Sequence, residues 1–370
     1  MKIGVNARFL AKPYTGIGQY TRFLFDELSK IDHENKYILI EPKKSGSFLT
    51  GFKKTYWEQC TLPKIFKKKK VDLVHSPYPC NPWFGSKIPQ IITIHDTIPW
   101  DMPEYRKTFL SKLYHSRTKN AAKKADLIIT VSEVSKKDIV RNLGISPDKV
   151  KVIYNAASPV FSHKIPESEN ILKKHNLEKP YILYVGGYDE RKNVKLLLDI
   201  YNNNIAPTHG VDLVMVGGKL HNQDLYSSFD SLTQNHNNST IESRNGGVKS
   251  LGFLPDEELA AIYQNCLCFC HLSKKEGFNI PIVEAIESEV PIVLSDIEVH
   301  REIAKDAATF VDLKSNEEIA KTLERVITDE TYRAGLAEKS ASLKGHYSWD
   351  KSAKEHLKIY HAYSLTRSTD

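Results

Sequence analysis

The feature that most constrains the fold is an alternation of short apolar runs and longer amphipathic segments. The short runs are rich in β-branched residues, which are typical of buried strands, and the segments between them repeat apolar residues at helical spacing. Strands alternating with helices predict a parallel sheet that is covered by helices on both faces. The first set has predicted strands at 2–7, 37–41, 73–75, 90–95, 127–131 and 150–154, and predicted helices at 16–30, 108–124 and 134–143.

The alternation restarts after a polar stretch around residues 162–170. Its predicted strands are 181–185, 211–216, 248–252, 266–271, 291–294 and 309–311, and its predicted helices are 194–201, 256–264 and 281–287, with a polar, asparagine-rich loop or irregular helix at 221–247. A chain of 370 residues suits two domains of about 150 to 200 residues each. We therefore expect an α/β protein with two Rossmann-like, doubly wound domains that face each other across a cleft. In such domains, ligands bind at the carboxyl ends of the strands.

Composition narrows the class of protein. Hydrophobic residues make up 41% and charged residues 26%, as in soluble globular proteins. No run approaches the ~18 apolar residues of a membrane-spanning helix, and the chain starts directly with a predicted strand. Five cysteines without framework spacing favour a reducing, cytoplasmic location.

A metal site at Cys266, Cys268, Cys270 and His271 is considered and rejected. On a strand, the three sulfurs would lie on one face at intervals of roughly 6.5 to 7 Å, and the histidine would point the other way. We interpret the cysteines as small apolar core residues. No metal ligands are predicted elsewhere.

Positive charge is concentrated in the first part of the chain. Residues 1–158 carry a formal charge of +14 and residues 159–370 carry −7, which together give +7. The functional interpretation is contact with an anionic partner, either a membrane surface or a pyrophosphate-linked acceptor, and the alternative is a solvated basic face. The sequence leaves both open. The main basic pairs and runs are Lys43–Lys44, Lys53–Lys54, Lys67–Lys70, Lys123–Lys124 and Lys136–Lys137.

Two glutamates flank a predicted helix N-terminus in the second half of the chain. Pro281 suits the first turn of a helix, and the residues just before it are Gly277, Phe278 and Asn279. Backbone amides at such a position bind phosphate or hydroxyl groups. Glu276 in the loop and Glu284 in the predicted first turn lie on either side of this anion-binding end. Each carboxylate alone could be a solvated or dipole-compensating charge, but the pair indicates a site.

A basic pair follows an earlier strand of the same half. Arg191 and Lys192 come after the predicted strand 181–185 and a glycine pair, and they precede a helix. Because they follow the carboxyl end of a strand, they should face the same crevice. A departing diphosphate needs such positive charge as its bond breaks.

These segments resemble glycosyltransferase family 4, whose members have the GT-B fold and retain the anomeric configuration of the donor sugar. Glu276 and Glu284 match the family's paired-glutamate signature. The resemblance implies that Glu276 contacts the transferred sugar and that Glu284 binds the ribose hydroxyls of the nucleotide. Lys192 matches the family's diphosphate-binding lysine. Two departures occur: Asn279 replaces a common glycine, and Gly187 stands where many members have an arginine, whose role passes to Arg191.

The resemblance covers nearly the whole chain. It implies donor contacts from Gly16 and Gly18 in the first loop, a catalytic hydrogen bond from His95 to the donor sugar, and a base-flanking loop at Phe253 and Leu254. It also implies a C-terminal helix that crosses back to the first domain. The expected domains are then residues 1–160, an acceptor-side domain; residues 161–345, a nucleotide-sugar-binding domain; and residues 346–370, the crossing helix.

The pattern is most similar to bacterial mannosyltransferases that build surface polysaccharides. This resemblance implies GDP-mannose as donor, a glycan or lipid-linked acceptor, and no separate cofactor. The chain has no Asp-x-Asp, so the usual metal-diphosphate bridge lacks its ligands. Rhamnosyl or glucosyl donors, a nucleotide-sugar epimerase and a non-catalytic sugar-nucleotide-binding subunit are the alternatives. Peripheral contact with the inner face of the membrane is compatible with the basic first domain, and nucleic acid is not an expected partner.

Overall fold

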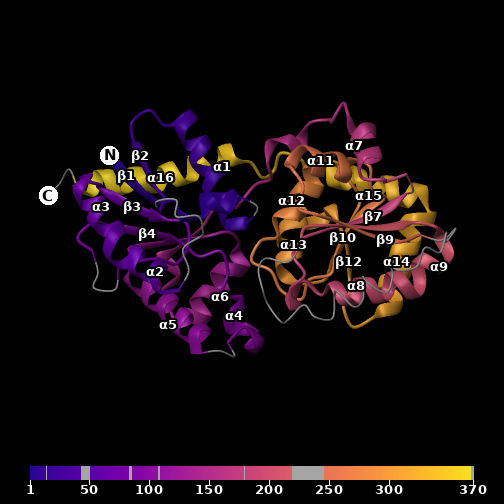
Figure 1. Cartoon of the computed structure of the whole chain (residues 1–370), viewed down its shortest axis with the longest axis horizontal. Helices are drawn as coiled ribbons and strands as arrows, with labels where there is room; N and C mark the ends of the chain where they lie inside the picture. Colours follow the sequence, from indigo (N-terminus) through magenta and orange to yellow (C-terminus); the bar gives the residue numbers. More distant parts are fainter. Residues whose placement is uncertain are drawn as a thin grey trace. The chain divides into compact units, whose positions relative to one another are not determined.

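The computed structural model describes residues 1–13, 15–42, 51–82, 86–106, 109–178, 180–218 and 246–367. The loop predicted at 221–247 therefore lies almost wholly outside the described residues. The contacts divide the chain into two compact units (Figure 1): Met1–Asn155 with Tyr347–Asp370, and Ala156–His346. None of the helices in the described ranges is long and apolar enough to span a membrane.

The first unit contains a parallel sheet of six strands in the order β2-β1-β3-β4-β5-β6. The strands are β1 Lys2–Asn6, β2 Lys36–Ile40, β3 Leu73–Ser76, β4 Gln90–Thr93, β5 Leu127–Thr130 and β6 Val150–Val152. The helical segments are η1 Arg8–Ala11, α1 Gly16–Ile31, α2 Gly51–Tyr56, η2 Trp57–Thr61, α3 Leu62–Lys68, α4 Ile98–Asp101, η3 Pro103–Arg106, α5 Phe109–Lys124, α6 Glu133–Leu143, η4 Pro147–Lys149 and α16 Trp349–Arg367.

Successive residues of the first sheet face opposite layers of helices. Val74 packs with the apolar side of η2 and α3, while Ile92 packs with α5 and α6. Their neighbours His75 and Thr93 point to the other face, where they meet α1 and α16 through hydrogen bonds. Because both faces are covered, the strands read as almost continuously apolar.

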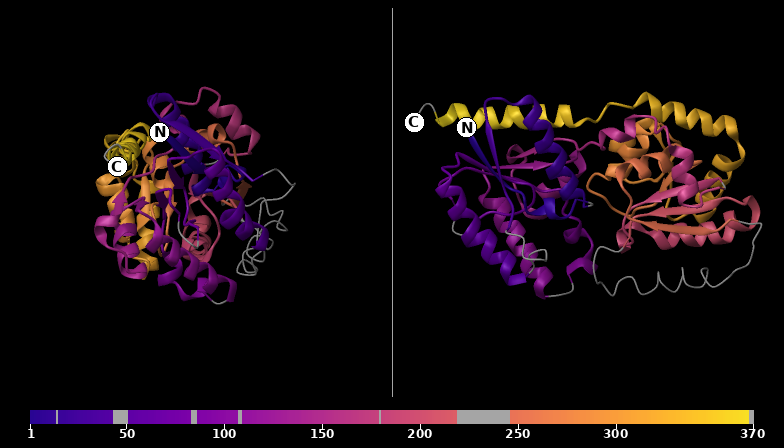
Figure 2. Two further views of the ribbon diagram at one scale, coloured as in Figure 1. Left: turned by 90° about the vertical axis from the view of Figure 1, so that its left-hand side faces the viewer. Right: turned by 45° about the horizontal axis from the view of Figure 1, so that its top comes forward.

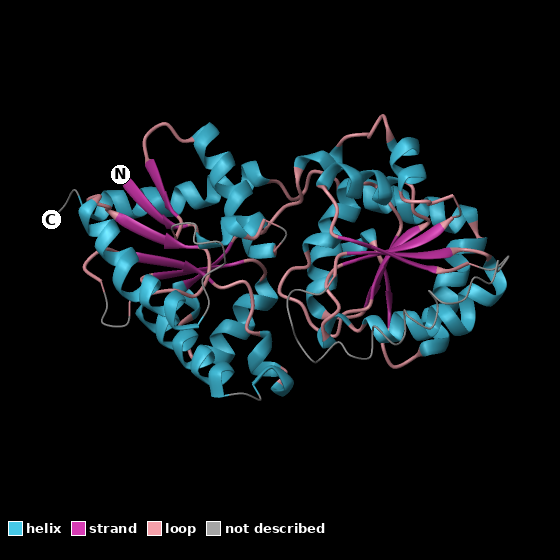
Figure 3. Cartoon of the chain, in the orientation of Figure 1, coloured by secondary structure: helices cyan, strands magenta, loops and turns pink. Residues whose placement is uncertain are grey.

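The second unit contains another parallel six-stranded sheet, in the order β12-β11-β10-β7-β8-β9. Figure 3 shows the strands in magenta with helices in cyan around them. Its strands are β7 Tyr181–Val185, β8 Asp212–Val216, β9 Val248–Gly252, β10 Cys268–His271, β11 Ile292–Ser295 and β12 Thr309–Val311. Its helical segments are η5 Pro159–Ser162, α7 Ser168–Lys174, η6 Glu190–Lys192, α8 Val194–Ile200, η7 Tyr201–Ile205, α9 Ala206–His209, α11 Asp256–Gln264, α12 Ile280–Glu287, α13 Glu298–Ala304, η9 Lys305–Ala307, α14 Asn316–Thr328 and α15 Glu330–Ser342.

This sheet is also covered on both faces. Ile182 and Tyr184 of β7 pack with α8 and α14 on one side. On the other side, the hydroxyl of Tyr181 donates to the Ile262 carbonyl of α11 at 2.8 Å. The predicted α/β class with two doubly wound parallel sheets is confirmed.

The helix α16 belongs to the first unit although it lies at the end of the chain. It packs along α1, as Figures 1 and 2 show in yellow and indigo. A buried polar cluster joins it to the sheet: the Tyr20 hydroxyl lies 2.8 Å from His356 Nε2, and the Tyr360 hydroxyl lies 2.7 Å from His75 Nδ1. All four side chains are fully buried.

Several predicted elements need correction. The strand predicted at 266–271 begins at Cys268, so Cys266 lies before it and does not share its pleat. Cys268 and Cys270 do lie on one face, inside the apolar core. The helices α2, α3, α14 and α15 were not predicted. The helix α6 is capped by Ser132, whose side chain accepts a hydrogen bond from the Ser135 amide at 3.0 Å.

Candidate functional site

The second sheet has its switch point between β7 and β10. From β7 the chain proceeds to β8 and β9 on one side, and it then returns to place β10 on the other side of β7. The loops that follow two such strands diverge at the carboxyl edge and leave space for a ligand. The loop after β7 contains Arg191 and Lys192, and the loop after β10 contains Glu276. The topology therefore brings the two predicted motifs together.

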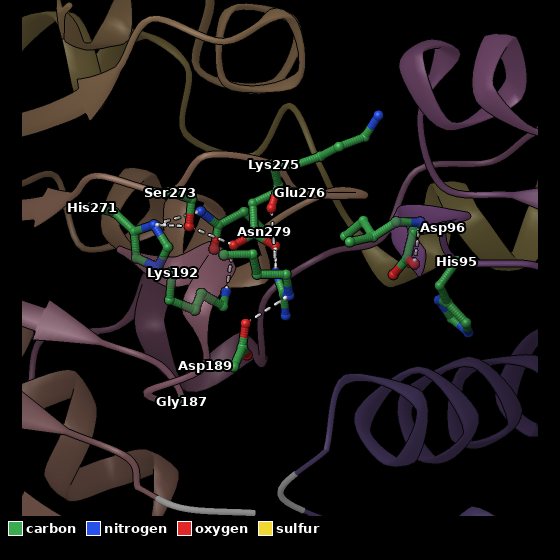
Figure 4. Close-up of polar contacts among 12 residues, drawn as sticks. His95, Asp96, Gly187, Asp189, Lys192, His271, Ser273, Lys275, Glu276 and Asn279 are labelled. Atoms are coloured by element: carbon green, nitrogen blue, oxygen red, sulfur yellow. Dashed lines mark hydrogen bonds and ion pairs between the residues drawn. The ribbon is translucent and has the colours of Figure 1, made fainter. Parts of the chain in front are cut away.

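Glu276 forms ion pairs with both cations of the neighbouring loop (Figure 4). Its Oε1 lies 2.6 Å from Lys192 Nζ, and its Oε2 pairs with an Arg191 guanidinium nitrogen. Ser273 donates a further hydrogen bond to Oε1 at 2.7 Å. Glu276 is 6% exposed and Lys192 is 8% exposed. Arg191 also meets Asp189, whose carboxylate lies 3.2 Å from the guanidinium Nε.

Burial and charge act in opposite directions on these groups. Burial raises the pKa of Glu276, but the adjacent Arg191 and Lys192 charges outweigh it and hold the pKa well below its ordinary value. Burial lowers the pKa of Lys192, against the opposing effect of Glu276. The geometry is that of a buried, charge-assisted cluster in which the acid is ionised.

A second layer of polar side chains supports this cluster. His300 Nδ1 lies 3.0 Å from the Ser295 carbonyl, which can only accept, so His300 Nε2 is an acceptor. Asn279 Nδ2 lies 3.1 Å from that Nε2 and 3.2 Å from His271 Nδ1. Two buried atoms here lack a hydrogen-bond partner, His271 Nε2 and Asn279 Oδ1. Such orphaned atoms are uncommon in folded proteins, although others occur elsewhere in the described residues.

The backbone explains why asparagine can stand in the glutamate motif. Asn279 caps α12 with φ of 74°, in the left-handed region that glycine adopts most readily and asparagine next. Asn193, directly after Lys192, has φ of 55° and turns the chain into α8. Both asparagines thus end the functional loops at positions that most side chains avoid.

Glu284 lies apart from the cations and has a different environment. It is the fifth residue of α12, one residue further in than predicted, because the helix begins at Ile280. It is buried, and the Tyr263 hydroxyl donates to its Oε2 at 3.1 Å. Burial raises the pKa of Glu284 to about 8, although the Tyr263 hydrogen bond acts to lower it.

The remaining predicted residues of the second unit take varied positions. Gly277 and Phe278 are buried between Glu276 and α12. Phe253 and Leu254 follow β9, where Phe253 is exposed beside Gly218 of the loop after β8, and Leu254 is half-buried. Lys275 points away from the Glu276 carboxylate in Figure 4.

His95 follows β4 in the first unit. Its Nε2 lies 3.0 Å from the Pro77 carbonyl, so Nε2 carries the proton and Nδ1 is an acceptor. Burial lowers the pKa of His95 to about 4, and its ring packs edge-on against Tyr20 at a centroid distance of 5.0 Å. A neutral histidine with a fixed tautomer suits a hydrogen-bonding role rather than a basic one.

Gly16 and Gly18 begin α1. The Thr15 hydroxyl caps this helix by accepting a hydrogen bond from the Gly18 amide at 3.1 Å. A Cβ on Gly18 would lie 2.1 Å from the Lys12 carbonyl oxygen, so close packing of the first loop already requires glycine there.

Sequence reasoning missed Asp189, Ser273, His271, His300 and Tyr263. Only Ser273 and His271 carried a signal, because they directly end or follow a buried strand. Tyr263 and His300 are brought in by helices α11 and α13, whose side chains reach the site only in the folded unit. No group of His, Cys, Asp or Glu within the described ranges is arranged to hold a metal ion.

Two family models match the chain. The family described as Glycosyltransferase Family 4 matches residues 20–159, and the family described as Glycosyl transferases group 1 matches residues 167–342.

Among curated proteins, the O-antigen chain mannosyltransferase B of Escherichia coli is 27% identical over 276 residues, which are 73% of this chain and 69% of the relative. The O-antigen chain mannosyltransferase RfbU of Salmonella typhimurium is 27% identical over 241 residues, 64% of this chain and 61% of the relative. The second match thus spans less than two thirds of the relative.

Among solved structures, the sucrose-phosphate synthase from Thermosynechococcus elongatus superposes with a TM-score of 0.75 at 16% identity, over 99% of both chains. This likeness concerns the fold alone, which is that of GT-B proteins.

Proposed function

Because this chain belongs to the glycosyltransferases, with a family 4 domain followed by a group 1 domain, we propose that it transfers mannose from GDP-mannose to a glycan or lipid-linked acceptor in surface-polysaccharide synthesis. Two bacterial O-antigen mannosyltransferases at 27% identity support the choice of sugar. We further propose that the transfer retains the anomeric configuration.

The observation that carries this proposal is the ion-paired cluster at the β7–β10 switch point. The side chains of Lys192 and Arg191 converge on the Glu276 carboxylate, and each contacts a different one of its two oxygens. Two cations that converge in a buried loop can hold the two phosphates of a nucleoside diphosphate and stabilise the charge that develops as the diphosphate departs. The family resemblance assigns Glu276 the hydrogen bonds to hydroxyls of the transferred sugar.

The other predicted residues complete the proposed donor site. Glu284 accepts hydrogen bonds from the ribose, with Tyr263 fixing its carboxylate. The family resemblance assigns His95 a hydrogen bond to the donor sugar, a role for which its neutral ring is suited. The acceptor hydroxyl attacks the anomeric carbon on the face from which the diphosphate leaves. The bond to the diphosphate breaks, the glycosidic bond forms, and the hydroxyl proton passes to the departing phosphate oxygen.

A panel of nucleotide sugars tests the donor. GDP-mannose, UDP-glucose and dTDP-rhamnose are supplied in turn, and released nucleoside diphosphate is measured with and without excess EDTA. We expect turnover with GDP-mannose that survives EDTA, because Lys192 and Arg191 supply the positive charge that a metal ion would otherwise provide. Turnover only with another donor would reject mannose, and a loss restored by magnesium or manganese would reject the assigned role of the two cations. No turnover with any donor would favour a non-catalytic binding subunit.

A further inference from the structure

Glu276 does not present a free carboxylate to an incoming sugar in this structure. Both of its oxygens are engaged: Oε1 with Lys192 Nζ at 2.6 Å and the Ser273 hydroxyl at 2.7 Å, and Oε2 with the Arg191 guanidinium. The proposed sugar-binding group and the proposed diphosphate-binding groups are therefore paired with one another.

The local charges are balanced in this arrangement. Lys192 and Arg191 provide two positive charges, and Glu276 and Asp189 provide two negative ones. The next cation, Lys274, is turned to an exposed ion pair with Glu190 at 2.8 Å. His271 is fully buried, and burial lowers its pKa well below the ordinary value, so it stays neutral. A diphosphate that entered this cluster would add further negative charge to a site that is already neutral.

The carboxylate also imitates the ligand in its geometry. A carboxylate presents two oxygens to two cations, as two phosphate oxygens would. A buried lysine without a counter-ion is costly, so Lys192 requires an anionic partner within the protein. Glu276 meets this need because Ser273, two residues after the end of β10, holds Oε1 toward Lys192.

From these contacts we propose that Glu276 is an internal stand-in for the donor diphosphate, and that the diphosphate displaces it from Lys192 and Arg191. This inference rests on the proposed function of the site. Displacement frees the carboxylate to bind the sugar hydroxyls only when a diphosphate is present. A sugar that lacks the diphosphate would leave Glu276 paired with Lys192 and Arg191. The carboxylate thus opposes nucleotide binding while it is required for transfer.

A double-mutant cycle with inorganic pyrophosphate tests this competition, because pyrophosphate carries neither base nor sugar. Isothermal titration calorimetry is applied to the wild type, Glu276→Gln, Lys192→Met and the double variant. Glu276→Gln should bind pyrophosphate about tenfold more tightly, because the anion no longer has to displace a charged carboxylate from Lys192 and Arg191. In the Lys192→Met background this gain in pyrophosphate affinity should largely disappear, because Lys192 is one of the two cations for which Glu276 and pyrophosphate compete.

A matched control removes the same charge elsewhere in this unit. Glu317→Gln on α14 breaks an exposed ion pair with Lys321 and should leave pyrophosphate binding unchanged. Glu276→Gln should also show a lowered thermal midpoint that pyrophosphate restores, because its cations lack a counter-ion until the anion binds.

The outcomes separate this inference from the proposed function. An equal gain with and without Lys192 would indicate direct repulsion and overturn the exchange, as would unchanged or weaker binding in Glu276→Gln. A wild type that binds pyrophosphate but no nucleoside diphosphate would reject the donor class and leave the exchange standing.

Discussion

The two glutamates of one short motif have opposite electrostatic environments. Glu276 has two cations within ion-pairing distance, whereas Glu284 has a neutral tyrosine hydroxyl. The pKa of Glu276 accordingly lies well below its ordinary value, and burial raises that of Glu284 to about 8. The Glu276 carboxyl is therefore ionised, whereas burial favours the protonated form of Glu284 near neutral pH.

Glu284→Ala should weaken nucleoside diphosphate binding by about 1 to 3 kcal/mol, the value of a lost hydrogen bond to a charged group. Ribose hydroxyls that donate to the carboxylate favour its ionised form. Since burial raises the pKa of Glu284 to about 8, the affinity of the wild type for GDP should rise between roughly pH 7 and pH 9. Calorimetric titration with GDP at several pH values measures both effects.

Glu284→Gln serves as the control, because it keeps the size of the side chain and cannot ionise. Its affinity for GDP should be flat over the same pH range. A flat profile in the wild type, or an equal slope in the two proteins, would remove Glu284 from the ribose site.

At the residue level, the sequence could predict which groups meet but not how they pair. Arg191, Lys192 and Glu276 all follow strand ends, and the strand order brings those ends together. The direct ion pairing of Glu276 with both cations depends on side-chain directions set by Ser273 and the left-handed turn at Asn279. Neither is visible in the spacing of the motif.

At the element level, α16 packs against the rest of the first unit through a buried cluster that includes two neutral histidines. His75, His356, Tyr20 and Tyr360 form the buried contact. Burial lowers the pKa of His356 to about 4, and burial with the neighbouring histidines lowers that of His75 well below 6.5. The unfolded chain would protonate both near pH 6.5.

The lowered pKa values of the two histidines predict that the first unit loses stability in acid. Because the unfolded state binds more protons below about pH 6.5, the contribution is complete above that pH and is lost as pH falls toward about 4. His356 alone should account for a loss on the order of 3 kcal/mol in unfolding free energy. Urea unfolding at pH 7.5, 6, 5 and 4 measures it.

His356→Gln should flatten this pH dependence, since it removes one titrating group. His361→Gln changes an exposed histidine of the same helix and should leave the profile as in the wild type. Identical slopes in all three proteins would show that other groups govern the acid lability.

The helices that were not predicted show where periodicity misleads. In α2, η2 and α3 the buried side chains are Trp57, Leu62 and Phe66, and many lysines surround them in the sequence. The apolar stripe is therefore narrow, and its helical spacing is too weak a pattern to predict these helices. The stripe becomes decisive only because it packs on Val74 of the sheet. The strands were easier to predict, because burial on both faces makes them apolar throughout.

At the scale of the whole molecule, the uneven charge predicts binding to anionic membranes through the first unit. Lys67–Lys70 are exposed at the end of α3, and Phe52 and Tyr56 are exposed on α2. Lys43 and Lys44 lie outside the described residues. Binding to vesicles with anionic lipid should weaken as added salt shortens the Debye length from ~10 Å to ~3 Å. Vesicle co-sedimentation across a salt series measures it.

Reversing the charge of Lys67–Lys70 should reduce vesicle binding strongly. A matched control reverses four exposed lysines of the second unit and should have little effect: Lys195, Lys314, Lys321 and Lys339. Binding that ignores salt, or that falls equally in both variants, would leave the basic surface as a solvated face.

The anomeric configuration of the product distinguishes retention from inversion in the proposed mannosyl transfer. The protein is incubated with GDP-mannose and a lipid-linked or synthetic glycan acceptor, and the one-bond carbon–proton coupling at the new anomeric centre is read by NMR. Attack on the face of the departing diphosphate, with Lys192 and Arg191 holding that group, preserves the α configuration of the donor. We expect an α-mannoside, and a β-mannoside would reject attack on the face of the departing diphosphate.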